Sequence, residues 1–448
     1  MSRVVIRNVS VLVVPEHGEC RVDDARDILV ENGRIVAVVP SASRGAGDFG
    51  GVGVEVVDGT GLVAVPGLVN SHTHSPMVMM RGAAEDLAIE DWFNQRIWPM
   101  EVNLTPERVR VGARLACAEM LLAGVTTFVD HYFHADQIAE AVIESGIRAD
   151  LAPTFFSSAG ADAIDAAFEQ TRELAGRHPR ITASLGPHAT YTVTDEDLRR
   201  AADFGRTNQL RIHLHAAETD DQTQASIDKH RVTPIQVLER TGVLDAGALI
   251  AHGCGIRPED LPILQRYPRT TVASCPKVYL KLAMGEVTPI RGLRAAGVEV
   301  GVGTDGAAVH NTLDVWEALR MVALTQKQRE NDATWMTLDD TLRLATRGSA
   351  AAAGLPDEIG VLEPGRQADI VLVDLSALHH QPVHNPKAVL VYSARASDVV
   401  TVLVAGQVVV RDRELTKMNL DEVLADAQAL AHTLVDLSRG GAVQNYAP

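Results

Sequence analysis

The chain has 448 residues, of which 46% are hydrophobic and 22% are charged, and its formal net charge at pH 7 is −17. This length is more than a single simple core needs and predicts at least two structural units. The acidic balance argues against nucleic acid as a partner, because binding phosphates requires clusters of lysine and arginine.

The first 65 residues predict short strands. Runs rich in β-branched residues at 3–14, 27–40 and 54–67 are interrupted by Asn-Gly and Asp-Gly pairs, which favour tight turns between strands. The glycine-rich stretch 43–53 predicts a loop between them.

From residue 66 to residue 357, short apolar segments alternate with segments of helix length. A helix is predicted over 107–123. Strands are predicted in the segments 61–70, 124–130, 181–189, 210–218, 248–253, 270–276 and 298–306. This alternation predicts a parallel α/β fold, most simply a (β/α)8 TIM barrel.

Strand-like runs return at 359–375, 388–394 and 399–412, and an amphipathic closing helix is predicted over 419–438. Neither end of the chain has enough strands to bury a core alone. We therefore expect both ends to join in one small composite β-sandwich. The predicted domains are 1–65 and 358–448, which build this sandwich, and 66–357, which build the barrel.

Histidines follow the first predicted barrel strand. His72 and His74 are two residues apart and point to the same face of a strand. A chain with 16 histidines can produce such a pair by chance. However, His215, His252 and Asp305 end three further predicted strands, and active groups of a TIM barrel lie at the carboxyl ends of different strands. This convergence predicts a metal site.

Several of these residues also have structural interpretations. Glu218, three residues after His215, can reach over the site or be a solvated loop carboxylate. The alternative interpretation of His252 is a core histidine, and that of Asp305 is a helix N-cap. We interpret His213 as a buried, hydrogen-bonded core residue.

The motifs "PGLVNSHTHSPMVMMRG", "LHAAET", "AHG" and "GVGTDGAA" occur in this order, and through them the chain resembles the amidohydrolase superfamily. The stretches "SLGPHATYTVTDEDL", "YLKLAMG" and "GTDGAAVHNTLDVWEALRMVALTQK" are most similar to the S-adenosylhomocysteine and 5′-methylthioadenosine deaminase subgroup. The resemblance covers nearly the whole chain and implies a barrel with a composite sandwich.

The resemblance implies that His72, His74, His215 and Asp305 bind a divalent metal ion. Neutral imidazoles and a carboxylate suit zinc with an open position for water, and Fe²⁺ and Mn²⁺ are alternatives. Binuclear relatives usually bridge two ions with a carboxylated lysine from a strand in the middle of the barrel. This chain has no lysine before Lys229, so we expect one ion.

Glu218, His252 and Asp305 are the predicted catalytic residues. Glu218 would move a proton from water to a ring nitrogen of the substrate, and His252 would stabilise charge developing at the attacked carbon. Asp305 would also orient the nucleophile. The predicted reaction is hydrolytic deamination of an amino-substituted nitrogen heterocycle, best matched by an adenosine-type nucleoside.

Glu101 and His188 match subgroup positions that contact the ribose and base, which makes them the predicted substrate-binding residues. A helix-surface carboxylate is the alternative for Glu101. His131 and His134 fit either the mouth of the site or structural roles. We predict that the remaining candidates pack in the core rather than form a pocket wall: Trp92, Phe93 and Trp98.

The chain departs from the subgroup in three places. The loop at 152–170 lacks the arginines that hold the sugar or amino-acid tail of thioether nucleosides. Val278 and Tyr279 replace a Ser-Asn pair, and Val309 and His310 stand where Ser and Asn are usual. A substrate without a carboxylate tail therefore stays open.

Other substrates and another class of function also stay open. The alternative substrates are guanine or 8-oxoguanine, a pterin, or a triazine that loses an amine or chloride. A catalytically inactive scaffold is the alternative of another class, and retention of every predicted ligand and of Glu218 argues against it.

The four cysteines lie far apart without metal-type spacing, which predicts free thiols in a reducing compartment. Neither a signal peptide nor a membrane helix is apparent. We expect a cytoplasmic homo-oligomer that acts on a small heterocyclic molecule and binds neither nucleic acid nor membrane.

Overall fold

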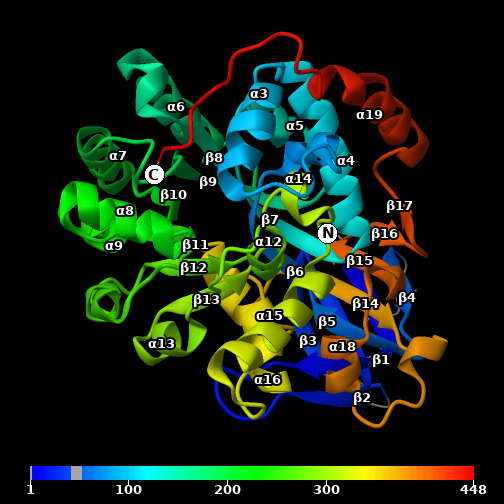
Figure 1. Ribbon diagram of the computed structural model, residues 1–448. Helices are drawn as coiled ribbons and strands as arrows, with labels where there is room; N and C mark the ends of the chain where they lie inside the picture. The colour runs from blue at the N-terminus through cyan, green and yellow to red at the C-terminus, as the bar shows by residue number, and fades with distance from the viewer. Residues whose placement is uncertain (1–2, 42–52, 448) are drawn as a thin grey trace.

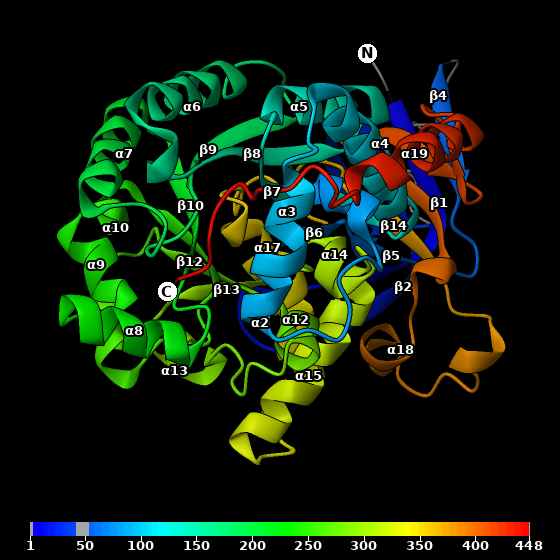
Figure 2. The same ribbon diagram turned by 45° about the horizontal axis from the view of Figure 1, so that its top comes forward.

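The computed structural model describes residues 3–41 and 53–447, which form two sheets and their surrounding helices (Figures 1 and 2). The loop predicted over 43–53 lies outside the described residues except for Gly53. One sheet contains eight strands and builds a barrel, and the other contains nine strands from both ends of the chain.

The barrel strands follow one another in chain order and pair in parallel. They are β6 (Leu68–Thr73), β7 (Val125–Tyr132), β8 (Arg148–Phe155), β9 (Ile181–Pro187), β10 (Arg211–Ala216), β11 (Ala248–His252), β12 (Thr271–Ser274) and β13 (Glu299–Val302). The backbone N–H groups of Asp305 and Thr304 donate to the carbonyl of His72 at 2.9 and 3.2 Å, which ties the end of β13 to β6. The predicted barrel is confirmed.

β8 is the barrel strand that the apolar pattern does not reveal, because charged residues interrupt it. Arg148 is buried and forms an ion pair with the buried Asp369, with 3.2 Å between Nη2 and Oδ1. Asp150 is also buried and accepts hydrogen bonds from the hydroxyls of Thr182 and Ser184 on β9. Burial of such groups is tolerated only where each one is paired, and pairing is invisible in a local sequence window.

Helices cover the outside of the barrel (Figure 2): α4 (Pro106–Leu122), α5 (Ala135–Ser145), α6 (Ala161–Leu174), α7 (Asp195–Asn208), α8 (Asp220–His230), α9 (Pro234–Arg240) and α15 (Val315–Glu330). The first of them matches the helix predicted over 107–123. It begins at Pro106 because the side chain of Thr105 accepts a hydrogen bond from the amide of Arg108, and proline suits the first helical position.

The second sheet combines β1 (Arg3–Val13), β2 (Arg21–Glu31), β3 (Arg34–Pro40), β4 (Val54–Asp58) and β5 (Leu62–Pro66) with β14 (Ile370–Asp374), β15 (Val399–Val404), β16 (Gln407–Arg411) and β17 (Glu414–Leu415). Antiparallel pairing of β5 with β14 joins the two ends of the chain. Val4, Ile6, Ile28, Ile370 and Leu372 belong to its separate apolar core. The prediction that both ends form one composite unit is confirmed.

The strand predicted over 388–394 is wrong, because residues 388–392 lie in helix α18 (Pro386–Tyr392), which ends just before Ser393. The side chain of Asn385 accepts hydrogen bonds from the amides of Lys387 and Ala388 and so starts a helix. Short apolar runs fit a buried helix as well as a strand. The closing helix is confirmed as α19 (Leu420–Leu434).

All four cysteines are free, as predicted, and all four are buried. Within residues 3–41 and 53–447, no helix has both the length and the apolar character needed to cross a membrane.

Candidate metal centre and active site

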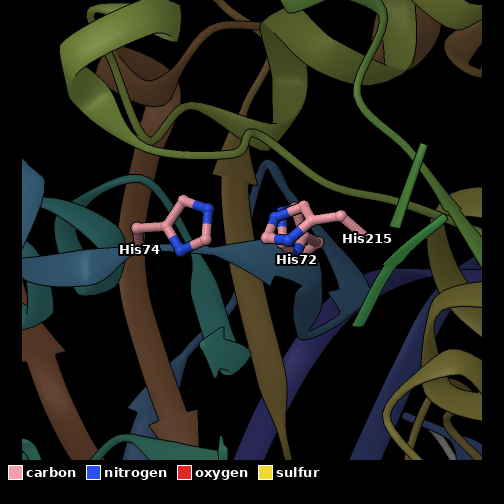
Figure 3. A group of neighbouring side chains, drawn as sticks. All are labelled: His72, His74 and His215. Atoms are coloured by element: carbon pink, nitrogen blue, oxygen red, sulfur yellow. The ribbon is translucent and has the colours of Figure 1, made fainter. Parts of the chain in front are cut away.

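Side chains from three barrel strands converge at the carboxyl end of the barrel. His72 and His74 come from the end of β6, His215 from β10, and Asp305 from just beyond β13. The Nε2 atom of His74 lies 3.2 Å from Oδ1 of Asp305, and that of His72 lies 3.9 Å from the same atom. The ligand atoms of the three histidines lie within 4.8 Å of one another, and Figure 3 shows their rings gathered around one space.

Each of these rings is held through its second nitrogen. Nδ1 of His74 donates to the carbonyl of His131 at 2.6 Å, and Nδ1 of His215 donates to the carbonyl of His188 at 2.8 Å. These bonds leave both Nε2 lone pairs free for the common centre. Nδ1 of His72 lies 2.8 Å from Nε2 of His213.

His213 is fully buried, which confirms its interpretation as a hydrogen-bonded core residue. It lies one layer below the site, and its hydrogen bond orients the ring of His72.

The centre has the chemistry of a divalent metal site. Nε2 of His72 is buried and has no hydrogen-bond partner within the described part of the chain. Such an orphaned atom costs about 1–3 kcal/mol unless something binds it. Burial lowers the pKa of His74 to about 4 and that of His215 to about 3, so both rings are neutral at pH 7. Neutral imidazoles with one carboxylate fit zinc.

Glu218 and His252 lie beside this centre. Nε2 of His252 is 3.8 Å from Oε1 of Glu218 and 3.8 Å from Oδ2 of Asp305. Burial raises the pKa of Glu218 to about 7, although a hydrogen bond from Gln222 opposes this rise. Burial also lowers the pKa of His252 well below its usual value. A carboxyl that titrates near neutrality therefore faces an imidazole that stays neutral.

The backbone is strained at two of these residues. His252 has a φ of 73° and Asp305 a φ of 61°, a left-handed conformation that costs non-glycine residues about 1–3 kcal/mol each. The hydroxyls of Thr288 and Thr73 donate to the carbonyls of His252 and Asp305, respectively, and so hold both turns. Strain that is held in this way is typical of functional sites.

These side chains open into one cavity at the carboxyl end of the barrel. His72 is fully buried and does not line the cavity. The other predicted site residues all line it: His74, Glu101, His188, His215, Glu218, His252 and Asp305.

The two predicted substrate-binding residues are buried. Glu101 lies at the end of α3 (Trp98–Glu101) and is 5% exposed, so the helix-surface alternative is wrong. Burial raises its pKa to about 8. His188 follows β9, and its Nδ1 lies 2.9 Å from Oγ1 of Thr192. Its ring centroid is 4.9 Å from that of His215, so it borders the metal centre directly.

Aromatic side chains form much of the cavity wall. Trp92, Phe93 and Trp98 line it while also packing against the apolar core, so the expectation of core packing alone is wrong. His131 lines this cavity, whereas His134 lines a second one. Further wall residues were not predicted, and their only signal in the sequence was a position at or just after the end of a barrel strand: Tyr132, Phe133 and Phe156.

The second cavity adjoins the first and shares Glu101, Tyr132, Phe133 and Thr154 with it. Its remaining walls come mainly from the region without arginines and are mostly apolar: Leu104, His134, Pro153, Ala163, Ala166, Ala167, Gln170 and Val443. Within the described residues, neither cavity is lined by lysine or arginine.

Known proteins are similar to this chain in sequence and architecture. The 5-methylthioadenosine/S-adenosylhomocysteine deaminase of Pelotomaculum thermopropionicum is 38% identical over 439 residues, which cover 97% of this chain and 100% of that protein. The 5′-deoxyadenosine deaminase of Methanoregula boonei is 37% identical over 397 residues, which cover 88% of this chain and 87% of that protein.

Two solved structures support the same relationship. An adenosine deaminase from Xanthomonas campestris with bound zinc superposes with a TM-score of 0.90 at 33% identity, covering 97% of this chain and 98% of that one. Atrazine chlorohydrolase from Arthrobacter aurescens, complexed with zinc, gives a TM-score of 0.85 at 27% identity, covering 96% and 100%. A profile of the amidohydrolase family matches residues 63–409. The resemblance read from the motifs is confirmed, and the chain belongs to the amidohydrolase family.

Proposed function

We propose that this protein is a zinc-dependent hydrolase that deaminates an adenosine-type nucleoside. One observation carries the proposal: the carboxyl of Glu218 lines the same cavity as a converged set of side chains that could hold a metal ion. The names of the deaminase relatives and the zinc in two related structures agree with it.

The ligand set proposed for zinc is His72, His74, His215 and Asp305, with Fe²⁺ and Mn²⁺ as alternatives. Zinc bound there would lower the pKa of water at the site toward neutrality. We expect a single ion, because the chain has no lysine before Lys229 to supply the usual bridge between two ions.

Glu218 is the proposed proton shuttle. Its pKa of about 7 makes both protonation states accessible near neutral pH. It takes a proton from the attacking water and delivers it to the ring nitrogen beside the amine-bearing carbon. The water oxygen then bonds to that carbon and the C–N bond to the amine breaks. The remaining hydroxyl proton passes to the amine, which leaves as ammonia.

His252 and Asp305 are the other proposed catalytic groups. Both ring nitrogens of His252 are buried without a hydrogen-bond partner among the described residues, so one is free to donate to the oxygen that gains charge at the attacked carbon. Asp305 lies 3.8 Å from this ring and would orient the attacking water.

An ammonia-release assay on zinc-loaded protein tests the proposed function. We expect turnover of 5′-deoxyadenosine and 5′-methylthioadenosine, and none of guanine, 8-oxoguanine, pterins or triazines. If ammonia or chloride is released only from one of the latter compounds, the substrate belongs to that class of compound and is not a nucleoside.

Glu101 is expected to bind the ribose hydroxyls through its carboxylate. Because burial raises its pKa to about 8, the ionised acceptor form predominates only above that pH. The KM for 5′-deoxyadenosine should therefore fall by roughly tenfold between pH 6.5 and 9, since hydrogen bonds to a charged acceptor are the stronger ones. Steady-state kinetics of Glu101→Gln should show a high KM without this pH trend. The same trend in the variant would exclude Glu101 as its source.

The apolar second cavity predicts selectivity for a neutral 5′-substituent. A carboxylate-bearing tail would lie against a cavity wall that has no arginine or lysine, where an unpaired charge costs binding free energy. We expect kcat/KM for 5′-methylthioadenosine to exceed that for S-adenosylhomocysteine by roughly 100-fold. Ala166→Arg places a cation in this wall and should reduce the ratio of the two kcat/KM values. Equal kcat/KM values in the unaltered protein would contradict the prediction.

A further inference from the structure

A segment near the end of the chain crosses the carboxyl end of the barrel. After α19, residues 435–447 run over this end and finish beside α8 (Figures 1 and 2). The amide of Val443 donates to the carbonyl of Trp98 at 3.2 Å, and Nε2 of Gln444 donates to Oγ of Ser158 at 3.0 Å. The segment is thereby attached to α3 and to the short helical turn Ser157–Ala159 that follows β8.

Tyr446 is held through both its backbone and its side chain. Its amide donates to Oδ1 of Asn94 at 2.8 Å, and Nδ2 of Asn94 donates back to its carbonyl at 3.4 Å. Its ring stacks on that of Phe93, with centroids 5.2 Å apart and planes inclined by 9°. It also meets the ring of Tyr191 edge-on at 5.5 Å. The side chain is therefore buried in an aromatic cluster behind the cavity wall.

Gln222, in the first turn of α8, connects Tyr446 to Glu218. Its Oε1 accepts from the amide of Glu218 at 3.2 Å. Its Nε2 donates to Oε2 of Glu218 at 3.0 Å and to the hydroxyl of Tyr446 at 3.1 Å. Rotating this amide by half a turn would set Nε2 against the backbone N–H of Glu218, so these bonds favour the orientation described.

We propose that Tyr446 and Gln222 are positioning residues that hold the Glu218 carboxyl in the orientation that proton transfer requires. Neither residue is among those that line the cavity, so both act through side chains that do line it: Glu218 and Phe93. This inference rests on the proposed role of Glu218. If the Glu218 carboxyl moved between rotamers, proton transfer would be slower, because small misplacements of reacting groups lower the reaction rate.

The two parts of Tyr446 have separable consequences. The hydroxyl accepts one of the two Nε2–H bonds of Gln222 and so affects the orientation of Glu218. The ring supports Phe93, which forms part of the substrate wall. Loss of the hydroxyl should therefore reduce kcat, whereas loss of the ring should also raise KM.

Steady-state kinetics with 5′-deoxyadenosine on the zinc-loaded full chain tests this proposal. Tyr446→Phe should lower kcat roughly tenfold at unchanged KM, and Gln222→Leu should lower it roughly 10- to 100-fold. Tyr446→Ala should also raise KM. Tyr392→Phe, on the distant helix α18, is the matched control and should match the unaltered protein.

A double-mutant cycle separates positioning from general destabilisation. Because both side chains act through one amide, the Tyr446→Phe/Gln222→Leu double variant should have the kcat of Gln222→Leu alone. Multiplicative losses, or an unchanged kcat in Tyr446→Phe, would overturn the proposal.

A crystal structure of a variant distinguishes failure of the positioning proposal from failure of the proposed function. A crystal structure of Tyr446→Ala should show the Glu218 side chain in more than one rotamer, whatever the substrate is. A single, unmoved Glu218 would overturn the positioning role even if deamination is observed. If Glu218 adopts several rotamers in Tyr446→Ala but the unaltered protein turns over no nucleoside, only the substrate assignment would be overturned.

Discussion

Glu218→Gln should lower kcat for 5′-deoxyadenosine by roughly a thousandfold, the middle of the range for a positioned acid–base group. The amide has nearly the same shape as the carboxyl, but it cannot take a proton from water. KM and metal content should stay unchanged, because Glu218 is not among the proposed ligands. Initial-rate kinetics and elemental analysis of the same preparation measure both effects.

Glu196→Gln, on the exposed surface of α7, is the control for this change. It makes the same chemical replacement far from the cavity and should leave kcat unaltered. If Glu218→Gln retained even a tenth of the activity, the proton path would have to run through another group. Absence of turnover in the unaltered zinc-loaded protein itself would favour the inactive-scaffold alternative.

His72→Ala should abolish measurable deamination by removing the metal ion. The variant loses one imidazole ligand, and His213 loses the partner that it orients. Without metal assistance, activation of water loses several kcal/mol, so kcat should fall by more than about a thousandfold. Elemental analysis should find one zinc per unaltered chain and less than a tenth of that in the variant.

Thermal unfolding gives a second measurement of the same site. Zinc that binds only the folded state raises the Tm, so adding it to metal-stripped unaltered protein should raise the Tm, and adding it to His72→Ala should not. His230→Ala, at the exposed end of α8, is the matched control and should keep its ion. An equal zinc content in His72→Ala would remove His72 from the ligand set.

The fold alone leaves the substrate open. The adenosine deaminase from Xanthomonas campestris and the atrazine chlorohydrolase from Arthrobacter aurescens superpose on this chain almost equally well, with TM-scores of 0.90 and 0.85. One architecture thus carries reactions on different heterocycles, as is common for TIM barrels. The substrate is therefore best argued from the cavity walls. The homo-oligomeric state expected from the sequence stays a prediction.

Much of the barrel and the candidate metal centre was readable from the sequence. His72, His74, His215 and Asp305 each follow a short apolar run, and parallel strands in a barrel bring their carboxyl ends together. Local pattern and one general rule of topology are enough to predict that these four meet. Helix α18 was misread because a short apolar run fits two conformations.

Only the tertiary structure showed what surrounds these residues. Gln222 and Tyr446 are 224 positions apart, yet they share a hydrogen bond beside Glu218. Arg148 and Asp369 are 221 positions apart and form a buried pair between the two sheets. Such contacts arise from the packing of distant segments, and no local pattern encodes them. The strand ends determine where the chemistry is placed, whereas long-range packing determines how its groups are held.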